Sequence, residues 1–71
     1  MKMKDVKIGT LVAVSDADDA TVWTITDTDR DNHGVQIAFR DKRRGIVSKD
    51  WIDISYLMLA TKAQLTHYYN S

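Results

Sequence analysis

Two stretches of the chain alternate strictly between apolar and polar side chains. In residues 21–26 the apolar Trp23 and Ile25 alternate with threonines, and residues 35–40 repeat the pattern with Val, Ile and Phe. A period of two predicts β-strands that bury one face. We therefore predict two strands here, with Trp23 and Ile25 pointing into the core.

Further strands and their connections follow from the segments on either side. Residues 8–15 are apolar on both faces, which is typical of a short strand with neighbours on each side. Residues 46–48 predict a short strand that completes a three-strand meander. Three segments rich in turn-forming residues predict the connections. They are a surface loop at residues 16–20, a long hairpin loop at residues 27–34 and a turn at residues 41–45.

The last third of the chain changes its pattern. Residues 49–59 mix Asp and Ser with large apolar side chains, which favours a single 3-10 turn followed by a short strand. Thr61 and Gln64 match the capping box of a helix start. A short C-terminal helix of about ten residues is therefore predicted, with an apolar stripe formed by Leu65, Tyr68 and Tyr69.

Composition agrees with a small all-β fold. The chain has 71 residues, which allows one domain with a small core. All ten acidic residues are aspartate, and a lack of glutamate beside abundant Thr, Val and Ile favours strands and turns over long helices. The absence of cysteine excludes disulfides and thiolate metal sites. Packing or self-association must then supply the stability.

The predicted order of elements is strand, acidic loop, three-strand meander, helical turn and short last strand. This order, from Val6 to Ala60, resembles the SH3-like barrels, including KOW and Tudor-type domains and many small phage and bacterial proteins. The resemblance is carried by residues 7–14, 22–25 and 50–57. It implies a five-stranded SH3-like barrel in residues 1–60, with residues 61–71 as a helical appendage.

Charge is balanced overall but segregated along the chain. Ten basic and ten acidic residues give a net charge of zero, so no whole-molecule field attracts nucleic acid or an anionic membrane. The acids crowd the first half, and a basic run follows in Arg40, Lys42, Arg43 and Arg44, supported by Lys49. Three interpretations stay open for this run: a polar hairpin tip, a phosphate contact, or a contact with an acidic protein surface.

Aromatic residues near the predicted helical turn suggest a contact surface. Trp51 stands between Asp50 and Asp53, where either a core or an interface position is compatible with the pattern. Tyr56 follows in the same turn. The predicted partner-binding residues are therefore Arg40, Lys42, Arg43, Arg44, Lys49, Trp51 and Tyr56.

Catalytic, cofactor and metal sites are not predicted. Three aspartates, Asp27, Asp29 and Asp31, match positions one, three and five of a calcium loop, but Ala38 replaces the bidentate glutamate at position twelve. A solvated hairpin loop is therefore favoured over a calcium site. The two histidines, His33 and His67, have no second ligand at metal spacing, and the serines lie in no nucleophile context.

These patterns favour a non-catalytic binding module that docks on a larger protein. Small phage or mobile-element proteins that modulate a host enzyme are similar in style. The alternative is a nucleic-acid-binding domain of the KOW or Tudor kind that uses the basic hairpin. The apolar stripe of the terminal helix either covers an open end of the barrel or joins a second copy as a homodimer.

Localisation follows from hydropathy. No apolar run approaches the ~20 residues needed to span a bilayer, and residues 1–5 lead into no signal-type hydrophobic stretch. We expect a cytoplasmic protein with no membrane contact.

Overall fold

The computed structural model describes residues 2–41 and 45–70, with side chains described throughout these ranges except at residues 40, 41 and 46–49. Most of the structure is one antiparallel sheet, with two 3-10 turns and one helix. In chain order the elements are η1 (Met3–Asp5), β1 (Leu11–Ala13), β2 (Trp23–Asp29), β3 (Gly34–Asp41), β4 (Gly45–Asp53), η2 (Ile54–Tyr56), β5 (Met58–Leu59) and α1 (Lys62–Asn70).

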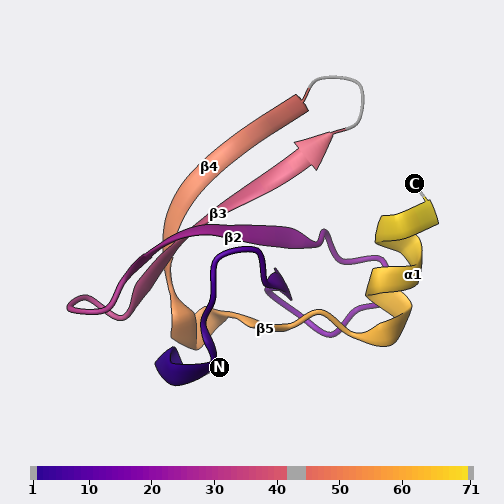
Figure 1. Cartoon of the computed structure of the whole chain (residues 1–71). Coiled ribbons are helices and arrows are strands. Elements are labelled where there is room, and N and C mark those ends of the chain that lie inside the picture. Colours follow the sequence, from indigo (N-terminus) through magenta and orange to yellow (C-terminus); the bar gives the residue numbers. More distant parts are fainter. Residues whose placement is uncertain (1, 42–44, 71) are drawn as a thin grey trace.

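The five strands lie in the order β4-β3-β2-β1-β5, and all neighbours are antiparallel. The long strands β2, β3 and β4 form a meander, and the short β1 and β5 extend it on the side of β2 (Figure 1). Five strands, a 3-10 turn before the last strand and a C-terminal helix were all predicted and are confirmed. The sheet is open, however, with β4 and β5 as its two edges among the described strands.

Two strands are longer than their sequence pattern predicts. β2 continues to Asp29, so the predicted hairpin loop shrinks to the turn at residues 30–33. A β-bulge after Ile25 shifts the register with β3 and resets the in-and-out alternation within this strand. β4 spans nine residues, so the helical turn expected from residue 49 onward begins only at Ile54.

The core lies on one face of the sheet. Val12, Ile25 and Val35 are completely buried, and four more apolar side chains join them, Val6, Ile37, Ile54 and Leu57. Ile25 points inward as predicted. Trp23 is half-buried, packs against this cluster and makes an edge-on contact with Phe39, with ring centroids 5.9 Å apart.

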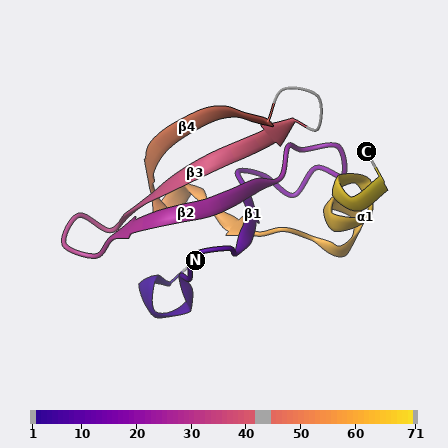
Figure 2. The same cartoon turned by 45° about the horizontal axis from the view of Figure 1, so that its top comes forward.

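The buried polar side chain of Gln64 ties the helix α1 to the loop between β1 and β2. The predicted capping box is confirmed, because the Thr61 N–H donates to Gln64 Oε1 at 2.9 Å and the Gln64 N–H donates to Thr61 Oγ1 at 3.1 Å. Gln64 Nε2 also donates to the carbonyl oxygens of Ser15 and Ala17, each at 2.8 Å. These bonds hold α1 beside the loop between β1 and β2 (Figure 2).

Among the described residues, no helix is both long enough and apolar enough to cross a membrane.

Candidate functional site

The predicted contact residues fall at different places along the β3–β4 hairpin. Lys42, Arg43 and Arg44 lie outside the described residues, so their prediction stays untested. The backbone of Arg40 pairs with Ile46, and that of Lys49 pairs with Ala38. Gly45, which directly follows the basic run, stands six residues before Trp51 on β4. The start of the strand at Gly45 is therefore roughly 20 Å from Trp51.

The two predicted aromatic residues both lie at the surface. Trp51, near the end of β4, has 52% of its side chain exposed, and Tyr56, in η2, has 68% exposed. Both rings are therefore accessible at the surface and contribute little to the core. Trp51 is therefore not a core residue, and its interface role stays a prediction.

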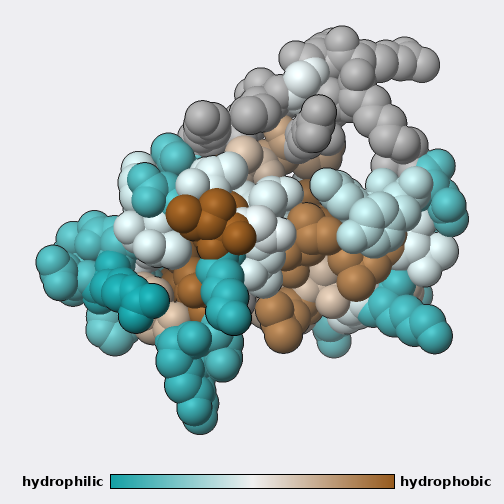
Figure 3. Space-filling view, in the orientation of Figure 1, coloured by the Kyte–Doolittle hydropathy of each residue, from teal (hydrophilic) through white to brown (hydrophobic). Residues whose placement is uncertain are grey.

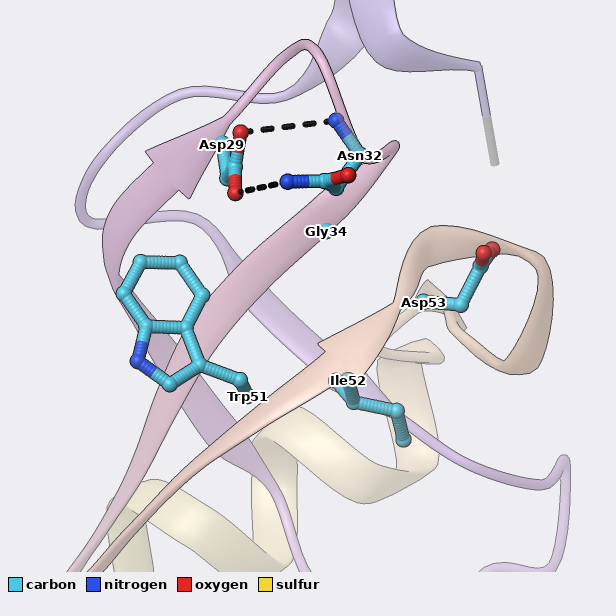
Figure 4. Close-up of a pocket in the computed structure, with 6 residues that line it drawn as sticks. All are labelled: Asp29, Asn32, Gly34, Trp51, Ile52 and Asp53. Carbon is cyan, nitrogen blue, oxygen red and sulfur yellow. Dashed lines mark hydrogen bonds between the residues drawn. The ribbon is translucent and has the colours of Figure 1, made fainter.

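Trp51 borders a shallow pocket of about 230 Å³. The pocket arises from the register, because Asp29, Gly34 and Asp53 stand side by side across three strands. Gly34 has no side chain and leaves a hollow beside Asp29 and Trp51, and the Asp53 carboxylate on the far side of Gly34 points toward η2 (Figure 4). Trp51 lies two residues before Asp53, so both side chains project from the same face of β4.

The turn between β2 and β3 forms one wall of the hollow. The Asp29 carboxylate accepts hydrogen bonds from the backbone N–H of Asn32 at 3.4 Å and from its Nδ2 at 2.8 Å (Figure 4). A carboxylate can only accept, so the amide nitrogen of Asn32 must face Asp29. The amide oxygen of Asn32 is left as an acceptor.

Asp53 forms the opposite wall and also begins η2. Its carboxylate accepts the backbone N–H of Ser55 at 2.9 Å, as an N-cap residue does. This hydrogen bond is the main cause that lowers the pKa of Asp53, and a smaller contribution comes from the charge of His33. Asp53 is therefore ionised at neutral pH.

Among the described side chains, the face around Trp51 is acidic. Asp27 on β2 and Trp51 on β4 both pair with Gln36 on β3. Asp27 therefore lies on the same face of the sheet as Trp51, Asp29 and Asp53. No lysine or arginine in the described part of the chain forms an ion pair with Asp29 or Asp53. These carboxylates therefore give the pocket a negative potential.

A second exposed region lies at the other edge of the sheet. Met58 and Leu59 on β5 are 39% and 59% exposed, and Val14, just after β1, is 53% exposed. Figure 3 shows apolar surface in the middle of the molecule, flanked by hydrophilic side chains. The predicted stripe on α1 is only partly exposed, with Leu65 and Tyr68 half-buried and Tyr69 largely in water.

The residues considered for metal binding do not converge. Asp27 and Asp29 belong to β2, and Asp31 lies in the following turn, so the calcium-loop pattern falls partly on a strand. Within residues 2–41 and 45–70, no three His, Asp, Glu or Cys side chains are placed to hold a metal ion. His33 and His67 are both exposed, one in the β2–β3 turn and one on α1.

Comparison with protein-family models, with curated proteins and with solved structures finds no match to this chain. Functional inference therefore depends on the geometry of the site. That geometry includes five residues that were not predicted as contact residues, Asp29, Asn32, Gly34, Ile52 and Asp53. One signal was present, because a glycine directly before a strand of alternating pattern can mark a place where a ligand approaches the backbone.

Proposed function

We propose that this chain is a non-catalytic binding module that docks on a larger protein of the cytoplasm through a surface centred on Trp51. The observation that carries the proposal is the half-exposed Trp51 ring beside the Gly34 hollow. Tryptophan is enriched among the residues that dominate binding energy at protein interfaces, especially next to a pocket. In this proposal the partner is a host enzyme whose activity the chain modulates.

The proposed architecture is an SH3-like fold whose sheet has β4 and β5 as free edges. Support comes from the order of elements and from the position of β1, which pairs with both β2 and β5. In this proposal the basic residues extend the docking surface from Trp51 toward the β3–β4 tip, and Tyr56 in η2 extends it at the other end of β4. Those basic residues are Arg40, Lys42, Arg43, Arg44 and Lys49.

A protein partner is favoured over nucleic acid because of the charges next to Trp51. A stacking aromatic in a nucleic-acid site normally lies in a basic groove that follows the phosphates. Here the neighbours of Trp51 on its own face include Asp27, Asp29 and Asp53, which repel phosphate. Nucleic-acid binding would have to rely on the basic run without help from Trp51.

Self-association through the C-terminal region is proposed as a second contact. The exposed Met58 and Leu59 on an edge strand, together with Tyr69, support it. Sedimentation of the wild type and of Leu59→Lys tests this contact. A dimer that Leu59→Lys separates into monomers is expected, and a monomer at all concentrations would contradict it.

The docking role of Trp51 is tested by affinity capture from a lysate of the organism that carries the gene. The immobilised proteins are the wild type, Trp51→Ala and Tyr69→Ala, and the last removes an aromatic ring that is 68% exposed on α1. We expect a protein that the wild type and Tyr69→Ala retain and that Trp51→Ala loses, with all three melting at similar temperatures. Equal recovery by all three would show that Trp51 is not the docking residue.

A further inference from the structure

The polar groups around the Gly34 hollow are nearly all acceptors. The carboxylates of Asp29 and Asp53 can only accept hydrogen bonds, and the Nδ2 donor of Asn32 is already used by Asp29. The amide oxygen of Asn32 adds a third acceptor. Apart from the indole N–H of Trp51, the hollow therefore offers acceptors and negative charge, which suit a ligand that is rich in donors and positively charged.

Metal ligands do not gather at this hollow. Asp29 and Asp53 stand on β2 and β4 with Gly34 of β3 between them, which places their backbones about 10 Å apart. Within residues 2–41 and 45–70, no third His, Asp, Glu or Cys side chain joins them to hold a metal ion. A cation with several hydrogen-bond donors suits these acceptors better.

A guanidinium has the required shape. It is planar, carries five N–H donors in a fixed fork, and stacks on an aromatic face while it donates to a carboxylate. The Trp51 ring supplies an aromatic surface at one side of the hollow, with Asp29 on another side and Asp53 across Gly34 (Figure 4). A lysine ammonium is a compact charge that would satisfy fewer of these acceptors at once.

We propose that the hollow bordered by Trp51, Asp29 and Asp53 binds the guanidinium of an arginine side chain on the partner protein. This inference deepens the proposed function and rests on it, since it names the chemistry that the docking surface recognises. The argument for a partner arginine is charge complementarity between a donor-rich cation and an acceptor-lined, negatively charged pocket beside an exposed indole. A second copy of this chain, which has its own arginines, is the competing occupant that the test must exclude.

The test is an NMR titration of the whole chain with a short blocked peptide, acetyl-Gly-Arg-Gly-amide. Two reporters lie at the hollow, the indole N–H of Trp51 and the amide of Gly34, and the indole of the core-facing Trp23 is the internal control. Matched peptides carry citrulline, which keeps the shape of arginine without its charge, or lysine. We expect saturable shifts of both reporters with arginine, affinity about fivefold weaker with lysine, and no saturation with citrulline.

Three variants locate the binding site. Asp53→Asn removes a charge and keeps an N-cap acceptor, so it should fold and bind arginine about fivefold more weakly. Asp50→Asn removes a charge from the same strand outside the pocket and should leave the affinity unchanged. Gly34→Ala adds a methyl group whose nearest neighbours would be Ile52 O at 3.6 Å and Asn32 O at 3.9 Å, ordinary contacts, so it fills the floor without strain and should weaken binding.

Each result has a defined meaning. Equal binding of citrulline and arginine, or shifts that do not reach Trp51 and Gly34, would overturn the inference. Self-association could also shift these reporters without peptide, in a way that depends on protein concentration and is lost in Arg43→Ala plus Arg44→Ala. That result would overturn the inference as well, because the occupant would then be a second copy of the chain. Capture of a partner that depends on Trp51 but is not reduced by Asp53→Asn or by the arginine peptide would overturn this inference and leave the proposed function intact. Loss of the Trp51 dependence itself would reject the proposed function.

Discussion

Gln64 is a polar side chain with no exposed surface, and its hydrogen bonds explain why burial is tolerated. Its oxygen accepts the Thr61 N–H, and its two amide hydrogens go to the carbonyls of Ser15 and Ala17. A buried amide is stable when its donors are satisfied, and here both are. Gln64 therefore starts the helix and also ties it to a loop 47 or more residues earlier in the chain.

Replacing Gln64 should release this link. Gln64→Leu keeps the volume but leaves the Ser15 carbonyl and the Thr61 N–H without their partner, whereas the Ala17 carbonyl keeps the Ala20 N–H at 3.0 Å. We therefore expect a loss of about 2–3 kcal/mol in the free energy of unfolding. Urea unfolding measures it. Thr66→Ala, on the exposed side of the same helix, is the control and should change stability by less than about 0.5 kcal/mol. If Gln64→Leu were as stable as the wild type, α1 would not be held in this way.

Asp53 should make stability depend on acid pH. Its pKa is lowered from 3.8, mainly by the Ser55 N–H, so folding favours the charged form. The stabilisation is complete above the unfolded-state pKa and is lost as the pH falls through the lowered folded-state value. Melting temperatures of the wild type and Asp53→Asn, which keeps a neutral cap, should therefore differ by a constant amount above about pH 5 and converge toward about pH 2. A difference independent of pH would show that the charge of Asp53 has no part in it.

At the scale of elements, the sequence predicts strands best where one face alone is buried. The alternation around Ile25 and Ile37 identified the central strands, and the Thr61–Gln64 pair identified the helix start. The bulge after Ile25 was not predictable in the same way, because it places an extra residue in one strand and interrupts the period of two. The last residues of β2 were predicted as part of a loop because this segment is rich in Asp and other turn-forming residues.

The residues of the candidate site were harder to predict from the sequence than the strands. Trp51 and Tyr56 stood out in the sequence because large aromatic residues among polar neighbours suggest contact. Asp29 and Asp53 come together across Gly34 only through the register of three strands, and the full length of β4 was not apparent from its irregular pattern. The pocket forms only when these three strands pair in the observed register. That register could not be predicted from the sequence, because the ends of β2 and β4 were not predicted correctly.

Two glycines offer a matched comparison of backbone conformations. Gly9, in the turn before β1, has a φ of +96° and donates its N–H to Ile25 O at 2.7 Å, whereas Gly34 lies in a strand. An L-residue in the left-handed region costs about 1–2 kcal/mol, so Gly9→Ala should lower stability by that amount although the added methyl group meets nothing within 4 Å. Gly34→Ala should be close to neutral. Equal thermal stability of the two variants would contradict this account of the turn.

At the scale of the whole molecule, charge balance bears on the nucleic-acid alternative. The net charge is zero, and the acidic face around Trp51 opposes phosphate. We expect no saturable binding when labelled DNA or RNA is titrated at low salt and followed by fluorescence anisotropy. Binding that weakens steeply with salt and disappears in Arg43→Ala plus Arg44→Ala would instead support the alternative.

The most direct test of a docking surface centred on Trp51 is photo-crosslinking in living cells. A photoreactive benzoylphenylalanine replaces Trp51 in one variant and Ile8 in another, because Ile8 is also well exposed, at 68%, and lies outside the pocket. The account predicts a discrete covalent adduct with another protein from position 51 and none from position 8. Irradiated cells that yield no adduct from position 51, or the same adducts from both positions, would contradict it.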